Sequence, residues 1–506
     1  MPIKISNITH GISIGLILGL LLSIGVLSPA YSQYMTGATV GSYAGVNSLV
    51  VNPALMANSR YYADVNIVSM GSFFHNNYAY FARDEYSIFQ LLNPSYRYPV
   101  HNKEYGTGER SAYTVENEFM KDVFLNGRII GPSAMVAYND HSFAFHTASR
   151  SVTSFTNIPY DMANFFYYSL DYSPQHGVEY EHDDPARTAS LTWSEMGVSW
   201  AYMFAKDNRH HWAFGVSAKL LFGHAAYYVY IDELDYYVPD DDNLYIRNVT
   251  GEVGYALPID YSSNELYNGS AIKGMGMGFD VGLSYTHTRS GHSDIMYRRP
   301  CEMKFQAYKY RVGISLMDFG WIGFNDVARQ YKFENNSGVW HEVDTLEPYY
   351  NNLNFISDDI NSRLFNNPGD AMVSNAFDMY LPLSLGLQFD YHYRDNWYIS
   401  GTMRLPIRHA KNQVQASSGL MVAPRMETQN LEFGVPFTLH EMIRPMLGAY
   451  MRFYNVTVGT DNVAGFLNLT NHYGYDIYIS VKVNFVKDRC KKKRPRFCTG
   501  DNPRGS

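Results

Sequence analysis

Large apolar side chains alternate with small or polar ones in two neighbouring segments, residues 193–205 and 211–223. The residues between them, Lys206-Asp207-Asn208-Arg209-His210, are of the types that turn a chain. Because successive side chains of a strand point to opposite faces, the pattern predicts a β-hairpin with one apolar face and one small or polar face. The apolar set comprises Met196, Val198, Trp200, Tyr202, Phe204, Trp212, Phe214, Val216, Leu220 and Phe222.

Faces of this kind recur along most of the chain, and no comparable set of amphipathic helices is present to cover them. A two-faced sheet that closes on itself satisfies its main-chain hydrogen bonds in a bilayer. We therefore expect an all-β fold, a transmembrane antiparallel β-barrel. The alternative interpretation is a large soluble all-β protein rich in aromatic residues.

Thirteen candidate strands follow from the alternation, but an antiparallel barrel of one bacterial chain normally has an even number. We expect about fourteen strands, with the miscounted one in residues 60–128. Short turns such as Asn139-Asp140 and Arg394-Asp395-Asn396 alternate with long polar stretches, as periplasmic turns and outer loops do in such barrels. The candidate strands are 61–73, 77–84, 129–138, 142–151, 191–205, 211–223, 275–288, 307–319, 381–393, 397–405, 428–437, 447–460 and 475–485, and the long stretches are 85–127, 152–190, 224–274, 320–380 and 406–427.

The N-terminus has the layout of a secretory signal peptide. An uncharged apolar run, 11–27, follows Lys4, and Ala30-Tyr31-Ser32 offers a cleavage site before Gln33. The alternative, a membrane anchor helix, would need a longer apolar run. We expect residues 1–32 to be a cleaved signal, 33–60 a plug, 61–485 the barrel in the bacterial outer membrane, and 486–506 a basic periplasmic tail.

Composition agrees with a barrel. The chain has 44 Tyr and 29 Phe, charged residues make up 17%, and mean hydropathy is −0.27, far below that of a helical membrane protein. A net charge of −8 argues against nucleic-acid binding. Lipid is therefore the expected surrounding partner.

Four short segments at strand ends carry a resemblance. Together they resemble an uncharacterised family of Bacteroidota outer-membrane barrels, related to the long-chain fatty-acid transporter (FadL-like) superfamily and to PorV-type subunits of the type 9 secretion system. The segments are Asn52-Pro53-Ala54, 313–320, 381–386 and 459–463. The resemblance implies a fourteen-stranded barrel with an N-terminal hatch inside its lumen.

Residues of the expected plug favour a compact fold. Gly45 permits positive φ or close packing, Asn52 can bond its own backbone, and Pro53 fixes its φ and precedes Ala54. We assign Gly45, Asn52, Pro53 and Ala54 to this hatch. A plain periplasmic linker is the alternative.

Inside the barrel, Glu195, Ser199, Ser217 and Lys219 fall on the small or polar face of the hairpin and are expected to face the lumen. Glu195 and Lys219 are candidates for an ion pair, either structural or lining a passage.

The sequence contains three cysteines. Cys301 stands alone, and an oxidising periplasm permits a disulfide between Cys490 and Cys498, with two free thiols as the alternative. No spacing of Cys and His resembles a metal site, and no catalytic motif is present, so we expect neither enzyme activity nor a cofactor.

Two functions remain open. The first is binding or passage of a hydrophobic small molecule across the outer membrane. The second is a non-transporting scaffold that docks a surface or secretion protein. Aromatic loop segments such as 227–230 suit either ligand capture or protein docking.

Overall fold

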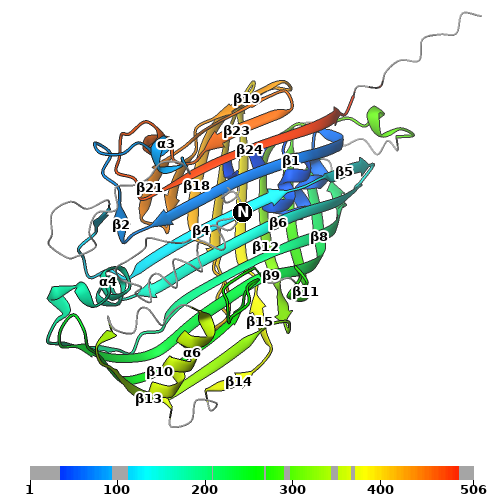
Figure 1. Cartoon of the computed structure of the whole chain (residues 1–506). Helices are drawn as coiled ribbons and strands as arrows, with labels where there is room; N and C mark the ends of the chain where they lie inside the picture. Colours follow the sequence, from blue (N-terminus) through cyan, green and yellow to red (C-terminus); the bar gives the residue numbers. More distant parts are fainter. Residues whose placement is uncertain are drawn as a thin grey trace, which may run out of the picture.

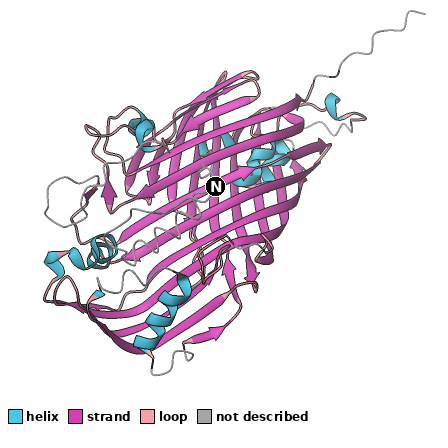
Figure 2. Ribbon diagram, in the orientation of Figure 1, coloured by secondary structure: helices cyan, strands magenta, loops and turns pink. Residues whose placement is uncertain are grey.

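The computed structural model describes residues 35–93, 112–207, 209–266, 269–289, 297–343, 352–365, 371–488 and 490. The expected signal peptide, residues 33–34 and the tail from 491 lie outside them. A closed antiparallel barrel of 14 strands forms the body of the molecule (Figures 1 and 2). Its strands, some built from two segments, are β1 (Tyr61–Asn76), β4 (Lys121–Ile130) with β5 (Ser133–Tyr138), β6 (His141–Ile158), β8 (Ala186–Asp207), β9 (His210–Val238), β11 (Gly274–Thr288), β12 (Tyr308–Phe324), β15 (Phe377–Tyr380) with β16 (Ser384–Arg394), β17 (Trp397–Pro406), β18 (Gly419–Glu427), β19 (Leu431–Gly434) with β20 (Phe437–His440), β21 (Arg444–Leu447) with β22 (Ala449–Phe453), β23 (Val456–Thr460) and β24 (Gly474–Val486).

The seam between the first and last strands closes the barrel. β1 pairs with β24 from Tyr61 opposite Val486 to His75 opposite Gly474. Each neighbouring pair of strands around the wall is likewise antiparallel. No edge is therefore left in the wall, as a bilayer requires.

Side chains on the two faces of the wall differ as the alternation predicted. On β8, Val198 is 61% exposed, whereas Ser199 and Ala201 are 5% and 0% exposed. Large apolar side chains on the other strands are exposed in the same way, for example Met275, Ile314 and Val422. An apolar outer band around a closed barrel is the architecture of outer-membrane proteins. Among the described residues, no helix is both long and apolar enough to cross a bilayer.

The two ends of the barrel differ. One, here the turn end, carries short connections such as 139–140, 395–396 and 454–455, together with the start of β1 and the end of β24. The other, here the loop end, carries the longer connections. Its elements are β2 (Ala79–Tyr80), α3 (Ile88–Leu91), β3 (Tyr113–Thr114), α4 (Tyr160–Tyr168), η3 (Ser169–Asp171), η4 (Ser173–Gln175), β7 (Val178–His182), β10 (Leu244–Ala256), β13 (Arg329–Trp340), α6 (Leu353–Leu364), β14 (Met372–Ser374) and α7 (Val463–Phe466).

At the loop end the sheet of the wall divides into two branches. β9 pairs with β11 as far as Gly223, and beyond Ala226 it pairs with β10 instead. β10 in turn pairs with β13, and β13 with β14. These three strands, with α6 and the distal part of β9, form an outer lobe that projects from the barrel (Figure 1). The stretches 224–274 and 320–380, expected as loops, thus contain much of a second sheet region.

Fourteen strands are confirmed, but three strand assignments from the sequence were wrong. Residues 77–84 add no barrel strand, because only Ala79 and Tyr80 are extended there and they pair with β3. Strand β18 was missed at 419–427, where Pro424 interrupts the expected pattern. The segment 447–460 is two strands, joined at Tyr454, whose φ of 49° makes the turn. The miscount therefore lay near the C-terminus as well as in 60–128.

The prediction that Cys490 pairs with Cys498 is also wrong. Cys490 is bonded to Cys301, 189 residues earlier, while Cys498 lies outside the described residues. Cys301 lies in η5 (Pro300–Glu302), a short helix in the connection between β11 and β12. Sequence spacing favoured the nearer cysteine, but the barrel brings the distant one beside the end of β24.

Closure of the β1–β24 seam predicts heat-modifiable migration. Unheated protein in denaturing detergent should stay a compact barrel and run faster on a gel than the boiled protein, because detergent alone does not break the sealed ladder. Identical mobility of the two samples would contradict closure.

Candidate functional site

The N-terminal segment 35–60, here the plug, folds inside the turn end of the barrel. It contains three short helices, α2 (Thr36–Thr39), η1 (Gly45–Val50) and η2 (Pro53–Asn58), and most of its residues are buried. Figure 1 shows these helices in dark blue, enclosed by the strands near the end of β24. The plug fills this part of the lumen.

Asn52 anchors the plug to three wall strands. Its side-chain amide donates to Gln388 Oε1 at 2.8 Å and to the main-chain oxygens of Ile314 and Leu283 at 3.2 and 3.3 Å. Its Oδ1 accepts from Ala54 N at 2.8 Å and so caps η2, whose first residue is Pro53. The side chain of Asn52 therefore both stabilises the turn and binds it to the wall.

Glycines in the wall make room for this turn. A Cβ on Gly282 would lie 2.0 Å from Asn52 Oδ1, and one on Gly215 would lie 2.4 Å from Ala54 N. These two glycines are cross-strand partners on β11 and β9. The wall and the Asn52-Pro53-Ala54 turn are thus complementary in shape.

Gly45 attaches the plug to the seam. Its φ is 59°, and a Cβ there would lie 1.9 Å from Asp64 Oδ2. That oxygen accepts from Val46 N at 2.8 Å and from Lys482 Nζ at 3.2 Å. Lys482 Nζ also donates to Ala44 O at 2.7 Å. Because Asp64 is on β1 and Lys482 on β24, the plug bridges the strands that close the barrel.

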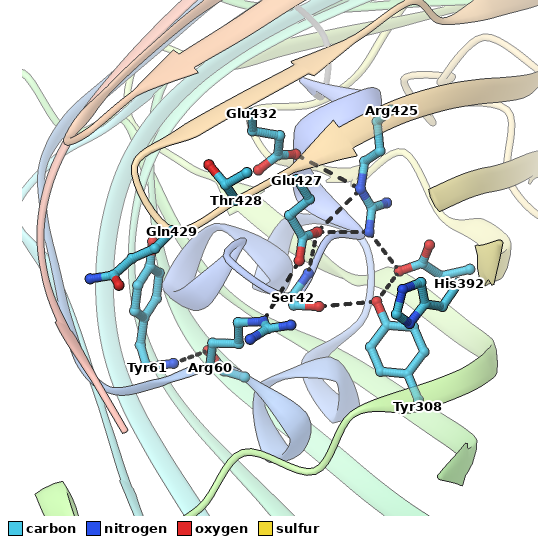
Figure 3. Close-up of polar contacts among 12 residues, drawn as sticks. Ser42, Arg60, Tyr61, Tyr308, His392, Arg425, Glu427, Thr428, Gln429 and Glu432 are labelled. Carbon is cyan, nitrogen blue, oxygen red and sulfur yellow. Dashed lines mark hydrogen bonds and ion pairs between the residues drawn. The ribbon is translucent and has the colours of Figure 1, made fainter. Parts of the chain in front are cut away.

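Buried ion pairs of β16 and β18 provide another contact for the plug (Figure 3). Arg425, fully buried, donates to Asp390 at 3.0 Å and to Glu427 at 2.9 Å. Glu427 accepts from the main-chain nitrogen of Ser42 at 3.3 Å, and Ser42 Oγ lies 3.0 Å from Tyr308 Oη. Pairing of this kind offsets the cost of burying charge.

A second ion network spans five neighbouring wall strands above the plug. Arg150 makes two hydrogen bonds with Asp318, at 2.7 and 2.8 Å. Lys219 contacts Asp318 at 2.9 Å and Asp280 at 2.8 Å, and Glu195 lies 3.5 Å from Arg150. A cavity of about 30 Å³, the size of one water, separates this network from plug residues including Leu49.

The predicted lumen-facing residues all lie inside the barrel, where they are buried. Ser199 and Ser217 are cross-strand partners whose hydroxyls lie 2.8 Å apart. Glu195 and Lys219 belong to one network, in which Glu195 contacts Arg150 and Trp193 while Lys219 contacts Asp280 and Asp318. The charges that link them, Arg150, Asp280 and Asp318, went unrecognised in the sequence.

Toward the loop end an apolar layer fills the lumen. It is made mostly of wall side chains, together with Ala256 of β10, Ala328 from the connection between β12 and β13, and Val414 from the connection between β17 and β18. The layer comprises Val152, Ala189, Leu191, Trp193, Leu221, Ala226, Tyr228, Ala256, Ile322, Phe324, Ala328, Phe377, Met379, Leu381 and Val414. Network, plug and layer together occupy successive levels of the barrel.

A cavity of about 240 Å³ lies beyond this layer, between α4, α6 and strands β8, β9 and β10. Its lining is almost entirely apolar, with Met162, Phe166, Val253, Phe333 and Ile360 among the contributors. No sequence motif marked it, since its residues come from segments expected to be loops.

Cations gather at the polar margin of this cavity. Arg187 Cζ and Lys411 Nζ lie 5.1 and 4.4 Å from the ring centre of Tyr230, and Arg187 and Tyr230 both line the cavity. Burial, together with the charge of nearby Arg187, lowers the pKa of Arg408.

Metal ligands do not gather in the described part of the chain, where no group of three or more His, Cys, Asp or Glu could hold an ion. The charged groups of the two networks in the lumen are paired with one another. The arrangement therefore suits structure and binding.

Comparison with known proteins gives one family. The model of a family of unknown function, DUF5723, matches residues 53–461. The chain belongs to this family. Curated protein sequences give no match.

Solved hydrocarbon channels are among the similar structures. A deletion mutant of the monoaromatic hydrocarbon channel TodX has a TM-score of 0.40 at 11% identity, covering 88% of this chain and 95% of that one. The P. putida toluene transporter TodX scores 0.37 at 9% identity, with the same coverage, and a Pseudomonas aeruginosa FadL homologue scores 0.22 at 9%, covering 88% and 96%. Because these TM-scores are low, the fold is assigned from the strand pairing of this chain alone. The relation to PorV-type subunits stays an expectation.

Plug docking predicts that Gly282→Ala weakens the plug. The new methyl group would collide with Asn52, at a cost of about 1–3 kcal/mol. In folded protein, chymotrypsin should then cleave at Tyr43 or Leu49 faster than in the wild type. Gly401→Ala is the control, because a Cβ there meets atoms no closer than 3.7 Å. Equal cleavage of both variants would contradict this docking.

Proposed function

We propose that the protein captures a hydrophobic small molecule at the loop end and passes it into or across the outer membrane. The observation that carries the proposal is the 240 Å³ apolar cavity of the outer lobe. An apolar cavity of this size stays dry and favours an apolar occupant over water. Its position, at the outer end of the barrel, is the place of first contact for a molecule arriving from outside.

The cations beside the cavity refine the proposed ligand. An acidic group placed near Arg187 and Lys411 would gain charge-assisted hydrogen bonds and offset the repulsion between Arg187 and Arg408. The apolar part of the same molecule would fill the space between α4 and α6. We therefore expect an apolar molecule that carries one acidic group.

Passage straight along the axis meets the apolar layer, the Arg150–Asp318 network and the plug in turn. A second cavity, of about 780 Å³, opens where the wall forks. It reaches from exposed Met275 to Phe324 and Phe377, which belong to the apolar layer. This arrangement supports a sideways route, in which an apolar molecule leaves through the wall rather than past the ion network.

Filling the cavity should abolish binding. Ile360→Trp places an indole in the cavity from α6, and Phe355→Trp on the same helix is the control, since Phe355 is 38% exposed and outside the lining. Both proteins would be purified in mild detergent and their bound molecules identified by native mass spectrometry. Co-purifying apolar molecules should be present with Phe355→Trp and depleted with Ile360→Trp.

Two results would contradict the proposal. Equal ligand content in both variants would place the bound molecules elsewhere. A stoichiometric protein partner without any bound small molecule would favour the docking scaffold instead, which is compatible with a filled lumen.

A further inference from the structure

The connection between β11 and β12 crosses the turn end of the barrel. Counting around the wall from β1, with β4 and β5 as one strand, β11 and β12 are sixth and seventh and β24 is the fourteenth. The disulfide between Cys301 and Cys490 therefore joins opposite sides of the opening. Residues 297–307, here the strap, lie next to the end of β24, and Figure 1 shows η5 there in green.

The strap meets the plug where the plug runs into β1. The guanidinium of Arg60 lies between two rings, 4.1 Å from the centre of Phe305 in the strap and 5.1 Å from that of Tyr43 in the plug. The main-chain oxygen of Arg60 accepts from Lys487 N at 3.0 Å, just past β24. Arg60 is thus held from the strap side and from the tail side at once.

The tail and the strap are also joined directly. Asp488 N donates to the main-chain oxygen of Met303 at 3.0 Å, and Met303 is buried. Two residues further along the tail, Cys490 forms the disulfide with Cys301. Strap, tail and bond together close a ring over Arg60.

We propose that this ring is a redox-dependent clamp that keeps the plug inside the barrel. The disulfide lies outside the strand ladder, so it adds little to the wall. What it does is hold the strap within reach of Arg60, because a covalent link between two segments of one chain limits how far they can separate. A disulfide oxidant outside the cytoplasm forms the bond by thiol–disulfide exchange and takes up the two electrons and two protons of the Cys301 and Cys490 thiols. A dithiol reductant returns them, restores both thiols and releases the strap.

Among the described residues, Phe305 of the strap stacks on Arg60 of the plug, and Tyr308, the first residue of β12, is hydrogen-bonded to Ser42 at 3.0 Å. Without the bond, the strap is attached to the barrel only through β11 and β12, and these contacts must keep it in place across the opening. The plug then opens more often, while the wall keeps all its strand pairs.

Hydrogen exchange measured by mass spectrometry tests the clamp on the full mature chain in nanodiscs. The wild type would be compared before and after reduction with a phosphine, which acts after folding is complete. Cys301→Ser and Cys490→Ser remove the bond genetically, and Cys498→Ser is the control that leaves it intact. Exchange in 35–60 and 297–307 should rise roughly tenfold in the reduced protein and in both bond-free variants. Peptides from β8 and β9 should be unchanged.

Unchanged exchange in 35–60 after reduction would overturn the proposal. A uniform rise that includes β8 and β9 would overturn it too, because the bond would then act on the whole barrel. Phe305→Ala, with the disulfide intact, should raise exchange near Tyr43 and Arg60 by a smaller factor. No change in that variant would show that the strap does not hold the plug through Arg60.

Discussion

The absence of water from the hydrocarbon region is the constraint on which this structure depends. Every main-chain amide in the wall needs a partner, so the sheet must close, and the β1–β24 seam does this. Closure then divides side chains strictly between lipid and lumen. Polar and charged side chains of the wall therefore point into the lumen, where they need hydrogen-bond or ion-pair partners.

The lumen meets this demand by pairing charges with charges and with the plug. Asp64 and Lys482 bind the plug at the seam, Asn52 binds it to strands on the opposite side, and Glu427 on β18 binds it between them. These contacts are polar, so their loss exposes groups that water can solvate once the plug moves. Burial of the same charges in a plug packed by apolar groups alone would cost more than it returns. The construction suits an element that stays in place and can still be displaced.

Alternation of apolar and small residues was enough to predict the barrel, the hairpin at 193–223 and its lumen-facing face. It failed where a strand breaks the pattern, as at Pro424 in β18, and where a turn lacks Gly, as at Tyr454. Loop-end strands such as β10 and β13 were missed because both of their faces carry mixed residues. Gly45 and Asn52-Pro53-Ala54 were assigned to a hatch because they have strong local conformational preferences, and that assignment stays a prediction.

Contacts between distant strands were beyond the sequence. Asp280 and Asp318 sit on the small-residue face of their strands, but only the register shows that Lys219 reaches both. Cys301 is likewise paired by the geometry of the closed barrel and not by spacing. The outer cavity forms where α4, α6 and three strands meet, so no single segment of the sequence indicates it.

Spin labelling of β8 in lipid bilayers tests the central claim most directly. Labels placed one at a time from Met196 to Ala201 would be probed with oxygen, which concentrates in hydrocarbon, and with a water-soluble nickel chelate. A closed two-faced wall predicts high oxygen accessibility at Met196, Val198 and Trp200 and low accessibility at Gly197, Ser199 and Ala201. Strong relaxation by the nickel chelate at Val198 and Trp200 would mean that water covers this face, and would contradict the account.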